Sequence, residues 1–275
     1  MSTLEGQQIC FFSTPGNAGD ALINAGTLAA FNRAGVRWES VQPGDHVQGR
    51  TLLIGGGGNL TPNYNHVELA MATFVESNPR KIVILPHGIR GQERVLKLLR
   101  SQDLVVCRDR IGFEHCRTST HAEVALAHDM AFHLDVRKFL EGEVLAVVAR
   151  PFLVERLAAC GWKLSQFNER RTMFFMRTDG ECVTGSAPTD IDISDQLIDG
   201  DVNRLSAISA WGLLECVRRS RQIVTDRLHV AVAAALLGTP TELLPNSYDK
   251  NRSVFDHSLR RFRHIRFAES RVDAA

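Results

Sequence analysis

Short, mostly apolar segments alternate with helix patterns along the chain, and this alternation constrains the fold more than any other feature. The first such segments are Ile9–Phe12, Thr51–Ile54 and Lys81–Leu85. Strands that are apolar at nearly every position are buried on both faces, as in parallel sheets covered by helices. The sequence therefore predicts an α/β fold with parallel sheets.

The same pattern continues through both halves of the chain. Further strands are expected at Leu104–Cys107, His121–Ala127, Thr172–Met176, Ile191–Ile193, Gln222–Val224 and Thr241–Leu244. Helices are expected at Ala21–Ala34, Val67–Glu76, Glu93–Arg100, Phe152–Cys160, Asn203–Arg219 and His229–Leu237. The stretch 135–171 is less regular, so we place a boundary within it. We predict two Rossmann-like domains, residues 1–140 and 141–275, with a ligand-binding cleft between them.

Charge and composition exclude several classes of protein. With 32 basic and 31 acidic residues the chain is nearly neutral, whereas nucleic-acid binding requires a strongly basic face. No apolar run reaches the ~18 residues of a membrane-spanning helix, and the N-terminal residues lack a signal-peptide pattern. The six cysteines form no C-x-x-C pair and are typical of a reduced compartment. We therefore expect a cytoplasmic protein with no nucleic-acid partner.

A run of four glycines, Gly55–Gly58, follows the second expected strand. It is not a dinucleotide or Walker motif, because Leu60 and Thr61 stand where G-x-G-x-x-G needs glycine and no G-K-[ST] follows. A strand-to-helix turn without side chains lets backbone N–H groups approach a ligand closely, whereas the alternative is a tight turn with no ligand. We favour the first interpretation and predict substrate contacts from Gly56, Gly57, Gly58 and Asn59.

Two other loops carry polar candidates for substrate binding. In P-G-N-A-G-D, Asn17 and Asp20 are candidates for binding substrate hydroxyls, and the alternative role of Asp20 is to cap the following helix. In P-H-G, His87 is a candidate for lining the cleft, and the alternative is a structural histidine.

The segment T-D-R-L-H, Thr225–His229, joins an expected strand to a helix. With Thr225 or Asp226 as the cap, Arg227 and His229 fall in the first helical turn. Free N–H groups and the positive end of the helix dipole point there, so these side chains build an anion site with a titratable group. The alternative is a solvated arginine and a structural histidine. An arginine at a helix start opposes the dipole, however, and residues that break a local rule are often functional.

A further arginine, Arg177, follows an expected strand in R-T-D-G-E and is expected to face the same cleft, with an ordinary exposed turn as the alternative. Arg108 and Asp109 end another strand, and an internal ion pair is the structural alternative to a role at the site. The sequence has no G-x-S-x-G nucleophile elbow and no metal-ligand motif. We therefore expect neither a metal nor a separate cofactor.

Taken in order, these segments resemble those of the polysaccharide pyruvyl transferase family. The matching pieces, between about residue 9 and residue 255, are G-N-A-G-D, G-G-G-G-N-L, L-P-H-G-I, V-V-C-R-D, H-D-M-A-F, R-T-D-G-E, T-D-R-L-H and N-S-Y-D-K-N. Each piece is short, and their shared order carries the resemblance.

The resemblance implies a fold similar to B-type glycosyltransferases, with the acceptor side in the N-terminal half and the donor side in the C-terminal half. It implies transfer of the pyruvyl unit of phosphoenolpyruvate onto two hydroxyls of a sugar, giving a cyclic ketal in an exopolysaccharide or cell-surface glycan. Arg177, Arg227 and His229 are then donor contacts, with Asp226 beside them. His229 and Arg227 are the catalytic candidates.

Several alternatives stay open. The chain is also compatible with a B-type glycosyltransferase that uses a nucleotide sugar, or with a non-catalytic sugar-phosphate binding module. His229 is the expected general acid, and the alternative gives proton transfer to Asp20 while His229 binds phosphate. The expected partners are the donor and a glycan or lipid-linked oligosaccharide acceptor. The basic tail, Arg260–Arg266, is expected to be a solvated surface, with contact at the inner face of a membrane as its alternative.

Overall fold

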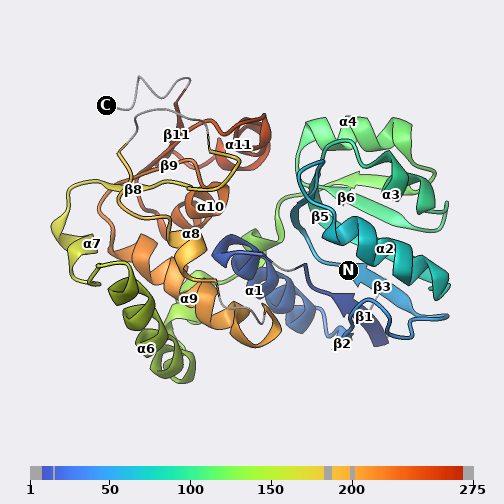
Figure 1. Cartoon of the computed structure of the whole chain (residues 1–275), viewed down its shortest axis with the longest axis horizontal. Helices are drawn as coiled ribbons and strands as arrows, with labels where there is room; N and C mark the ends of the chain where they lie inside the picture. The colour runs from blue at the N-terminus through green and yellow to red at the C-terminus, as the bar shows by residue number, and fades with distance from the viewer. Residues whose placement is uncertain (1–7, 15, 183–187, 199–201, 269–275) are drawn as a thin grey trace. The chain divides into compact units, whose positions relative to one another are not determined.

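The computed structural model describes residues 8–14, 16–182, 188–198 and 202–268 of the chain (Figure 1). The expectation about a signal peptide concerns residues 1–7, which lie outside this range. The chain forms two compact units. The first contains the described residues of Met1–Thr14 and Gly26–His133, and the second those of Pro15–Ala25 and Leu134–Ala275. The predicted cleft between two domains stays a prediction.

The first unit is built on a parallel sheet in the order β2-β1-β3-β5-β6-β7, with β4 also pairing with β5. The strands are β1 (Gln8–Phe12), β2 (Arg37–Ser40), β3 (Thr51–Ile54), β4 (Gly57–Leu60), β5 (Lys81–Ile89), β6 (Leu104–Cys107) and β7 (Glu123–Leu126). The helices are α1 (Ala18–Arg33, shared with the second unit), α2 (His66–Glu76), α3 (Glu93–Leu98), α4 (Arg110–Ser119) and the 3₁₀ helix η2 (Met130–His133).

The core of the first unit lies between this sheet and helices α2, α3 and α4 (Figure 1). Leu52, Ile54 and Ile84 of the central strands are fully buried, and Phe74 of α2 packs in the same cluster. Burying a side chain of this size contributes about 1.5–3 kcal/mol, so the continuous apolar strands account for the sheet's stability.

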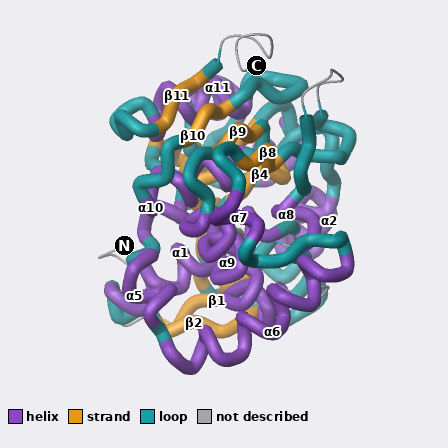
Figure 2. The backbone as a smooth tube through the Cα atoms, turned by 90° about the vertical axis from the view of Figure 1, so that its left-hand side faces the viewer, coloured by secondary structure: helices purple, strands orange, loops and turns teal. Residues whose placement is uncertain are grey.

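The second unit contains a parallel sheet in the order β11-β10-β9-β8, whose strands lie side by side in Figure 2. The strands are β8 (Met173–Phe175), β9 (Ile223–Thr225), β10 (Thr241–Leu243) and β11 (Ile265–Phe267). The helices are α5 (Val136–Glu141), α6 (Glu143–Ala159), α7 (Gln166–Glu169), α8 (Ile193–Gln196), α9 (Val202–Arg219), α10 (Leu228–Leu237), α11 (Lys250–Val254) and the π-helix η3 (Phe255–Leu259).

Helix α10 is apolar on every side and forms the centre of the second unit. Its alanines and valines are buried, and it contacts α9 and three strands of the sheet. A helix that is apolar on all sides is stable in water only when neighbouring elements cover it. The packing around α10 therefore holds its first turn in place. That first turn carries His229.

Several predicted elements differ from those observed. The predicted strand Ile191–Ile193 is instead the start of α8, since Asp192 accepts a hydrogen bond from the N–H of Asp195 and caps the helix, which begins at Ile193. Strand β2 was not predicted, since it lies at the sheet edge and three of its four residues are exposed. The basic tail ends in β11, which pairs with β10.

Two observations relate to expectations from the composition: the state of the cysteines and the character of the helices. All six cysteines are free, and Cys10, Cys107, Cys116 and Cys216 are buried as small core residues. In the part of the chain that the structure describes, no helix has the length and apolar character needed to cross a membrane.

Candidate functional site

The T-D-R-L-H segment connects β9 to α10, but its cap differs from the prediction. Thr225 ends the strand, donates its hydroxyl to the carbonyl of Phe175 (2.5 Å) and accepts the N–H of Arg227 (3.0 Å). Asp226 accepts the N–H of Arg177 (2.8 Å). The side chains of Thr225 and Asp226 therefore bond to backbone groups at the end of the sheet. Arg227 is the N-cap of α10. His229 lies in the first helical turn, as predicted.

Arg177 follows β8 and is only 5% exposed. Its Nε and Nη2 atoms donate to the two oxygens of Asp179, at 2.7 and 2.9 Å, and its Nη1 donates to Glu181 at 2.6 Å. The alternative of an ordinary exposed turn is therefore wrong for the arginine itself. A buried guanidinium is tolerated because carboxylates surround it.

Arg227 is 4% exposed and lies in the same cluster. Its Nε donates to Asp192 at 2.8 Å, its Nη2 contacts the other oxygen of that carboxylate, and its Nη1 lies 2.9 Å from Asp179. The alternative of a solvated arginine is wrong. Arg177 and Arg227 thus meet at one carboxylate, that of Asp179.

The charges of the two arginines set the ionisation of Asp179. Burial alone would raise the pKa of Asp179, but the hydrogen bond from Arg177 and the charge of Arg227 lower it to about 2. Burial would lower the pKa of Arg177, and its bonds to Asp179 and Glu181 raise it instead. Arg177 and Asp179 are therefore both charged at neutral pH.

The N-S-Y-D-K-N segment also contacts this cluster. Asn251, fully buried, donates to the carbonyls of Asp226 (2.8 Å) and Leu244 (2.9 Å). The ammonium group of Lys250 contacts Glu181. This segment carries part of the family resemblance, and no sequence pattern indicated its role in the cluster.

The P-G-N-A-G-D loop also belongs to the second unit. The N–H of Gly19 donates to Asn17 (2.8 Å), and the carboxylate of Asp20 accepts the N–H of Asn17 (2.9 Å). This is a reciprocal cap, so Asn17 rather than Asp20 precedes the helix. Gly19 lies against His229: a Cβ at Gly19 would be 2.6 Å from the ring Nδ1. The loop therefore helps to position His229.

The glycine-rich segment in the first unit is not the strand-to-helix turn that was predicted. Gly57–Leu60 is strand β4, and β5 extends through the P-H-G segment because β4 pairs with it. Gly57 has φ = 149°, a conformation that favours glycine. The substrate contacts predicted for this segment stay predictions.

His87 is fully buried in β5 and holds the glycine-rich segment in place. Its Nε2 accepts the N–H of Asn59 (3.0 Å), which leaves Nδ1 to donate to the carbonyl of Gly55 (3.2 Å). Burial, followed by the charge of Arg108, lowers the pKa of His87 to about 3. The ring is therefore neutral and serves as a structural link, and its proposed substrate contact stays a prediction.

Arg108 and Asp109 are both in internal ion pairs, each with a different partner. Arg108 pairs with Asp129 of the H-D-M-A-F segment (2.8 Å). Asp109 caps α4 by accepting the N–H of Gly112 (2.9 Å) and pairs with Arg90 (3.1 Å). The side chains of Arg108 and Asp109 are both buried. The V-V-C-R-D and H-D-M-A-F segments therefore stabilise the first unit.

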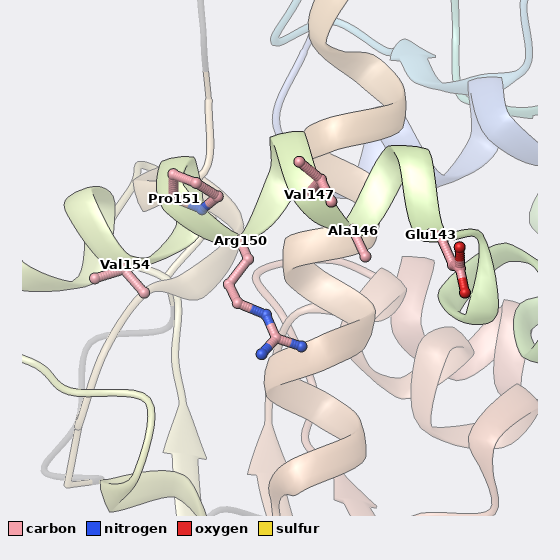
Figure 3. A pocket seen from close by; sticks show the side chains of 6 residues that line it. All are labelled: Glu143, Ala146, Val147, Arg150, Pro151 and Val154. Atoms are coloured by element: carbon pink, nitrogen blue, oxygen red, sulfur yellow. The ribbon is translucent and has the colours of Figure 1, made fainter.

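A surface hollow lies on helix α6 and is shown in Figure 3. Its described lining residues are Glu143, Ala146, Val147, Arg150, Pro151 and Val154. None of these is a predicted site residue. Among the described residues, no group of three or more His, Cys, Asp or Glu side chains is arranged to hold a metal ion.

Asp179, Glu181 and Asp192, which contact the two arginines, were not predicted as site residues. Asp179 and Glu181 stand in the R-T-D-G-E segment, where their spacing from Arg177 was available as a signal. Asp192 lies 35 positions from Arg227 in a segment interpreted as a strand, and no local pattern indicates their pairing.

The chain has two parallel sheets, and two buried arginines lie after β8 and β9. Comparison with known proteins defines the class. A model of the polysaccharide pyruvyl transferase family matches residues 17–248. The chain therefore belongs to the polysaccharide pyruvyl transferase family and is a transferase.

A solved structure agrees with this fold. The chain is similar to a functionally uncharacterised protein from Klebsiella pneumoniae, with 25% sequence identity and a TM-score of 0.78. The match covers 98% of this chain and 95% of that protein. No curated protein matches the chain.

Proposed function

We propose that this transferase moves the pyruvyl unit of phosphoenolpyruvate onto a sugar of an exopolysaccharide or cell-surface glycan and forms a cyclic ketal. Family membership gives the class of enzyme, while donor and acceptor are our proposal. The observation that supports it most is the meeting of Arg177 and Arg227, both buried, at one anionic group beside the start of α10.

Phosphoenolpyruvate suits this cluster because it is small and carries a carboxylate and a phosphate. Guanidinium groups bind both groups with paired, charge-assisted hydrogen bonds. His229 lies two residues after Arg227, at the first turn of α10. A donor held by the two arginines therefore brings its reactive carbons to the same end of the sheet as an imidazole.

The reaction requires a proton at the methylene carbon of the donor, which leaves C2 with the character of a cation. A sugar hydroxyl adds to C2 and loses its proton, and the C2–O bond to phosphate breaks. The second hydroxyl then adds to C2 and loses its proton, so the products are the ketal and inorganic phosphate. We assign delivery of the first proton to His229, because an imidazole can donate and accept a proton as a general acid or base. Arg227 is assigned to stabilise the charge that grows on the leaving phosphate.

A second assignment gives proton transfer to Asp20. The reciprocal cap between Asp20 and Asn17 gives that carboxylate a structural role, so the contact between Gly19 and the imidazole favours His229. The acceptor is a glycan or a lipid-linked oligosaccharide in this proposal, which places the reaction at the cytoplasmic face of a membrane.

The identity of the donor is tested by thermal unfolding and by product release. Phosphoenolpyruvate at 100 times its Kd should stabilise the protein by about 2.7 kcal/mol, while UDP- and GDP-sugars should leave the melting temperature unchanged. Inorganic phosphate should appear only when a suitable lipid-linked oligosaccharide is added. Stabilisation by a nucleotide sugar instead would favour a glycosyltransferase and contradict this proposal.

A further inference from the structure

The carboxylate of Asp179 occupies the position at which the two arginines meet. One of its oxygens accepts from Nε of Arg177 at 2.7 Å. The other accepts from Nη2 of Arg177 and lies near Nη1 of Arg227, both at 2.9 Å. Three guanidinium nitrogens of two residues therefore converge on one carboxylate. Such an arrangement binds a planar anion with high specificity.

The other two carboxylates of the cluster are built into the fold. Asp192 is buried and also accepts the N–H of Thr178 (2.9 Å) and its hydroxyl (3.2 Å). Glu181 is buried and also contacts Lys250. Asp192 takes the Nε–Nη2 edge of Arg227, and Glu181 takes Nη1 of Arg177. Each of these carboxylates thus orients one arginine.

Asp179 differs from both in its exposure, although it also accepts the N–H of Glu181 in its own turn (3.1 Å). It lies in an exposed turn with Thr178 and Gly180, and its side chain is 39% exposed. If its carboxylate turned toward solvent, Arg177 would keep Glu181 and Arg227 would keep Asp192. An incoming anion would then restore the charge balance, so the exchange leaves no buried guanidinium unpaired.

We propose that the position now held by the Asp179 carboxylate is the binding position for the carboxylate of the donor, clamped by Arg177 and Arg227 together. Asp179 is an internal anion that keeps both arginines oriented and is displaced when the donor enters. This inference rests on the proposed function and refines it, because the two arginines share one anionic group instead of taking one each.

The test compares Asp179→Asn and Asp179→Ala with the wild-type protein, and Asp256→Asn serves as the matched control. Asp256 pairs with Arg252 (2.9 Å) in the same unit, and both side chains are about half exposed. Isothermal titration with phosphoenolpyruvate should show a Kd about fivefold to tenfold lower in both Asp179 variants, because the competing internal anion is gone. The control should bind as the wild type does.

Pyruvate and inorganic phosphate distinguish the group that is bound. Each is titrated into the same proteins, with binding followed by the shift in melting temperature. The Asp179 variants should gain affinity for pyruvate, a carboxylate without phosphate, by a larger factor than for inorganic phosphate. A gain for phosphate alone would overturn the carboxylate assignment.

Two results would contradict the inference without touching the proposed function. Unchanged affinity in both variants, with phosphoenolpyruvate-dependent phosphate release intact, would mean that Asp179 does not occupy the donor's position. Loss of phosphoenolpyruvate binding in both variants, with the fold intact by circular dichroism, would mean that Asp179 belongs to the permanent frame. If the wild type did not bind phosphoenolpyruvate at all, the proposed function would fail, and the pyruvate titration would still decide the role of Asp179.

Discussion

Buried charged side chains in the second unit lie next to groups of opposite charge. This pairing explains how arginine side chains can be buried there. Arg177 and Arg227 together contact three carboxylates, and a fourth, on Asp226, accepts a backbone N–H. Removing one partner of a buried ion pair typically lowers the free energy of unfolding by about 3–5 kcal/mol, because the remaining charge is buried without a partner or solvent. Substitutions of Asp192 are therefore expected to reduce stability as well as activity.

The imidazole of His229 is the residue on which the proposed chemistry depends. If it delivers the proton, His229→Ala should lower kcat about 10²-fold or more, with little change in the melting temperature. Phosphate release under saturating phosphoenolpyruvate measures kcat. His229→Gln keeps a polar group of similar length and should be equally slow. A wild-type rate in both variants would exclude His229 as the acid and favour Asp20.

Gly19 gives an independent test of the position of that imidazole. A Cβ on Gly19 would lie 2.6 Å from Nδ1 and 2.8 Å from Cβ of His229, so Gly19→Ala must displace the ring. We expect kcat to fall about tenfold or more, as small misplacements of catalytic groups are costly. The matched control is Gly142→Ala, whose added Cβ meets ordinary contacts of 3.5 Å or more. An equal effect of both substitutions would contradict the contact.

The site was predictable at the residue scale only where its members are local in the sequence. The R-T-D-G-E and T-D-R-L-H segments follow strands, and a parallel sheet places the ends of neighbouring strands together. Those rules indicated Arg177, Arg227 and His229. They did not indicate Asp192, because its pairing with Arg227 depends on the tertiary path of the chain.

At the scale of elements, the burial pattern limited what the sequence could reveal. Fully apolar strands such as Thr51–Ile54 were predicted with their observed bounds. The glycine-rich strand β4 was not, since glycine has low strand propensity and its pairing with β5 is set by His87 and by tertiary contacts. Helix α6 begins at Glu143 and runs through Pro151, whereas the predicted helix began only at Phe152.

The link between His87 and β4 makes the first unit sensitive to acid. The folded-state pKa of His87, about 3, lies below its usual 6.5, so the unfolded chain binds the proton more readily. The contribution is complete above about pH 6.5 and is lost as the pH falls toward 3. Lowering the pH from 6.5 to about 5 should cost about 1–2 kcal/mol. Hydrogen exchange of β4 and β5 amides measures this loss.

The control for that prediction is His87→Gln. This variant should be less stable at neutral pH because the contacts to Asn59 and Gly55 weaken. It should also lose the part of the pH dependence that comes from protonating the ring. Identical pH profiles in the two proteins would show that another group is responsible.

The outer face of α6 shows why an apolar run need not indicate burial. Val147 is 73% exposed and lines the hollow in Figure 3, whereas Leu153 of the same helix is fully buried. Val147→Gln should therefore change the free energy of unfolding by no more than about 0.5 kcal/mol, while Leu153→Ala should cost about 2–5 kcal/mol. Thermal unfolding of both variants measures the difference. A large loss from Val147→Gln would mean that this face is covered in solution.

For the whole molecule, division into two compact units means that ligand binding need not stabilise every part equally. Each proposed donor contact belongs to the second unit, as does the P-G-N-A-G-D loop, which packs against His229. Opening of β8, β9 or the first turn of α10 breaks the cluster and releases the donor. Opening of the first unit's sheet leaves those contacts intact.

Hydrogen exchange with and without phosphoenolpyruvate tests this separation. At 100 times its Kd the donor should slow exchange about 100-fold at β8, β9 and the start of α10, because amides there exchange only after the donor leaves. Amides of β1, β3 and β6 should exchange at unchanged rates, since their opening does not break a donor contact. Protection confined to the first unit would place the donor at the glycine-rich segment and His87, and would require the roles of the two units to be exchanged.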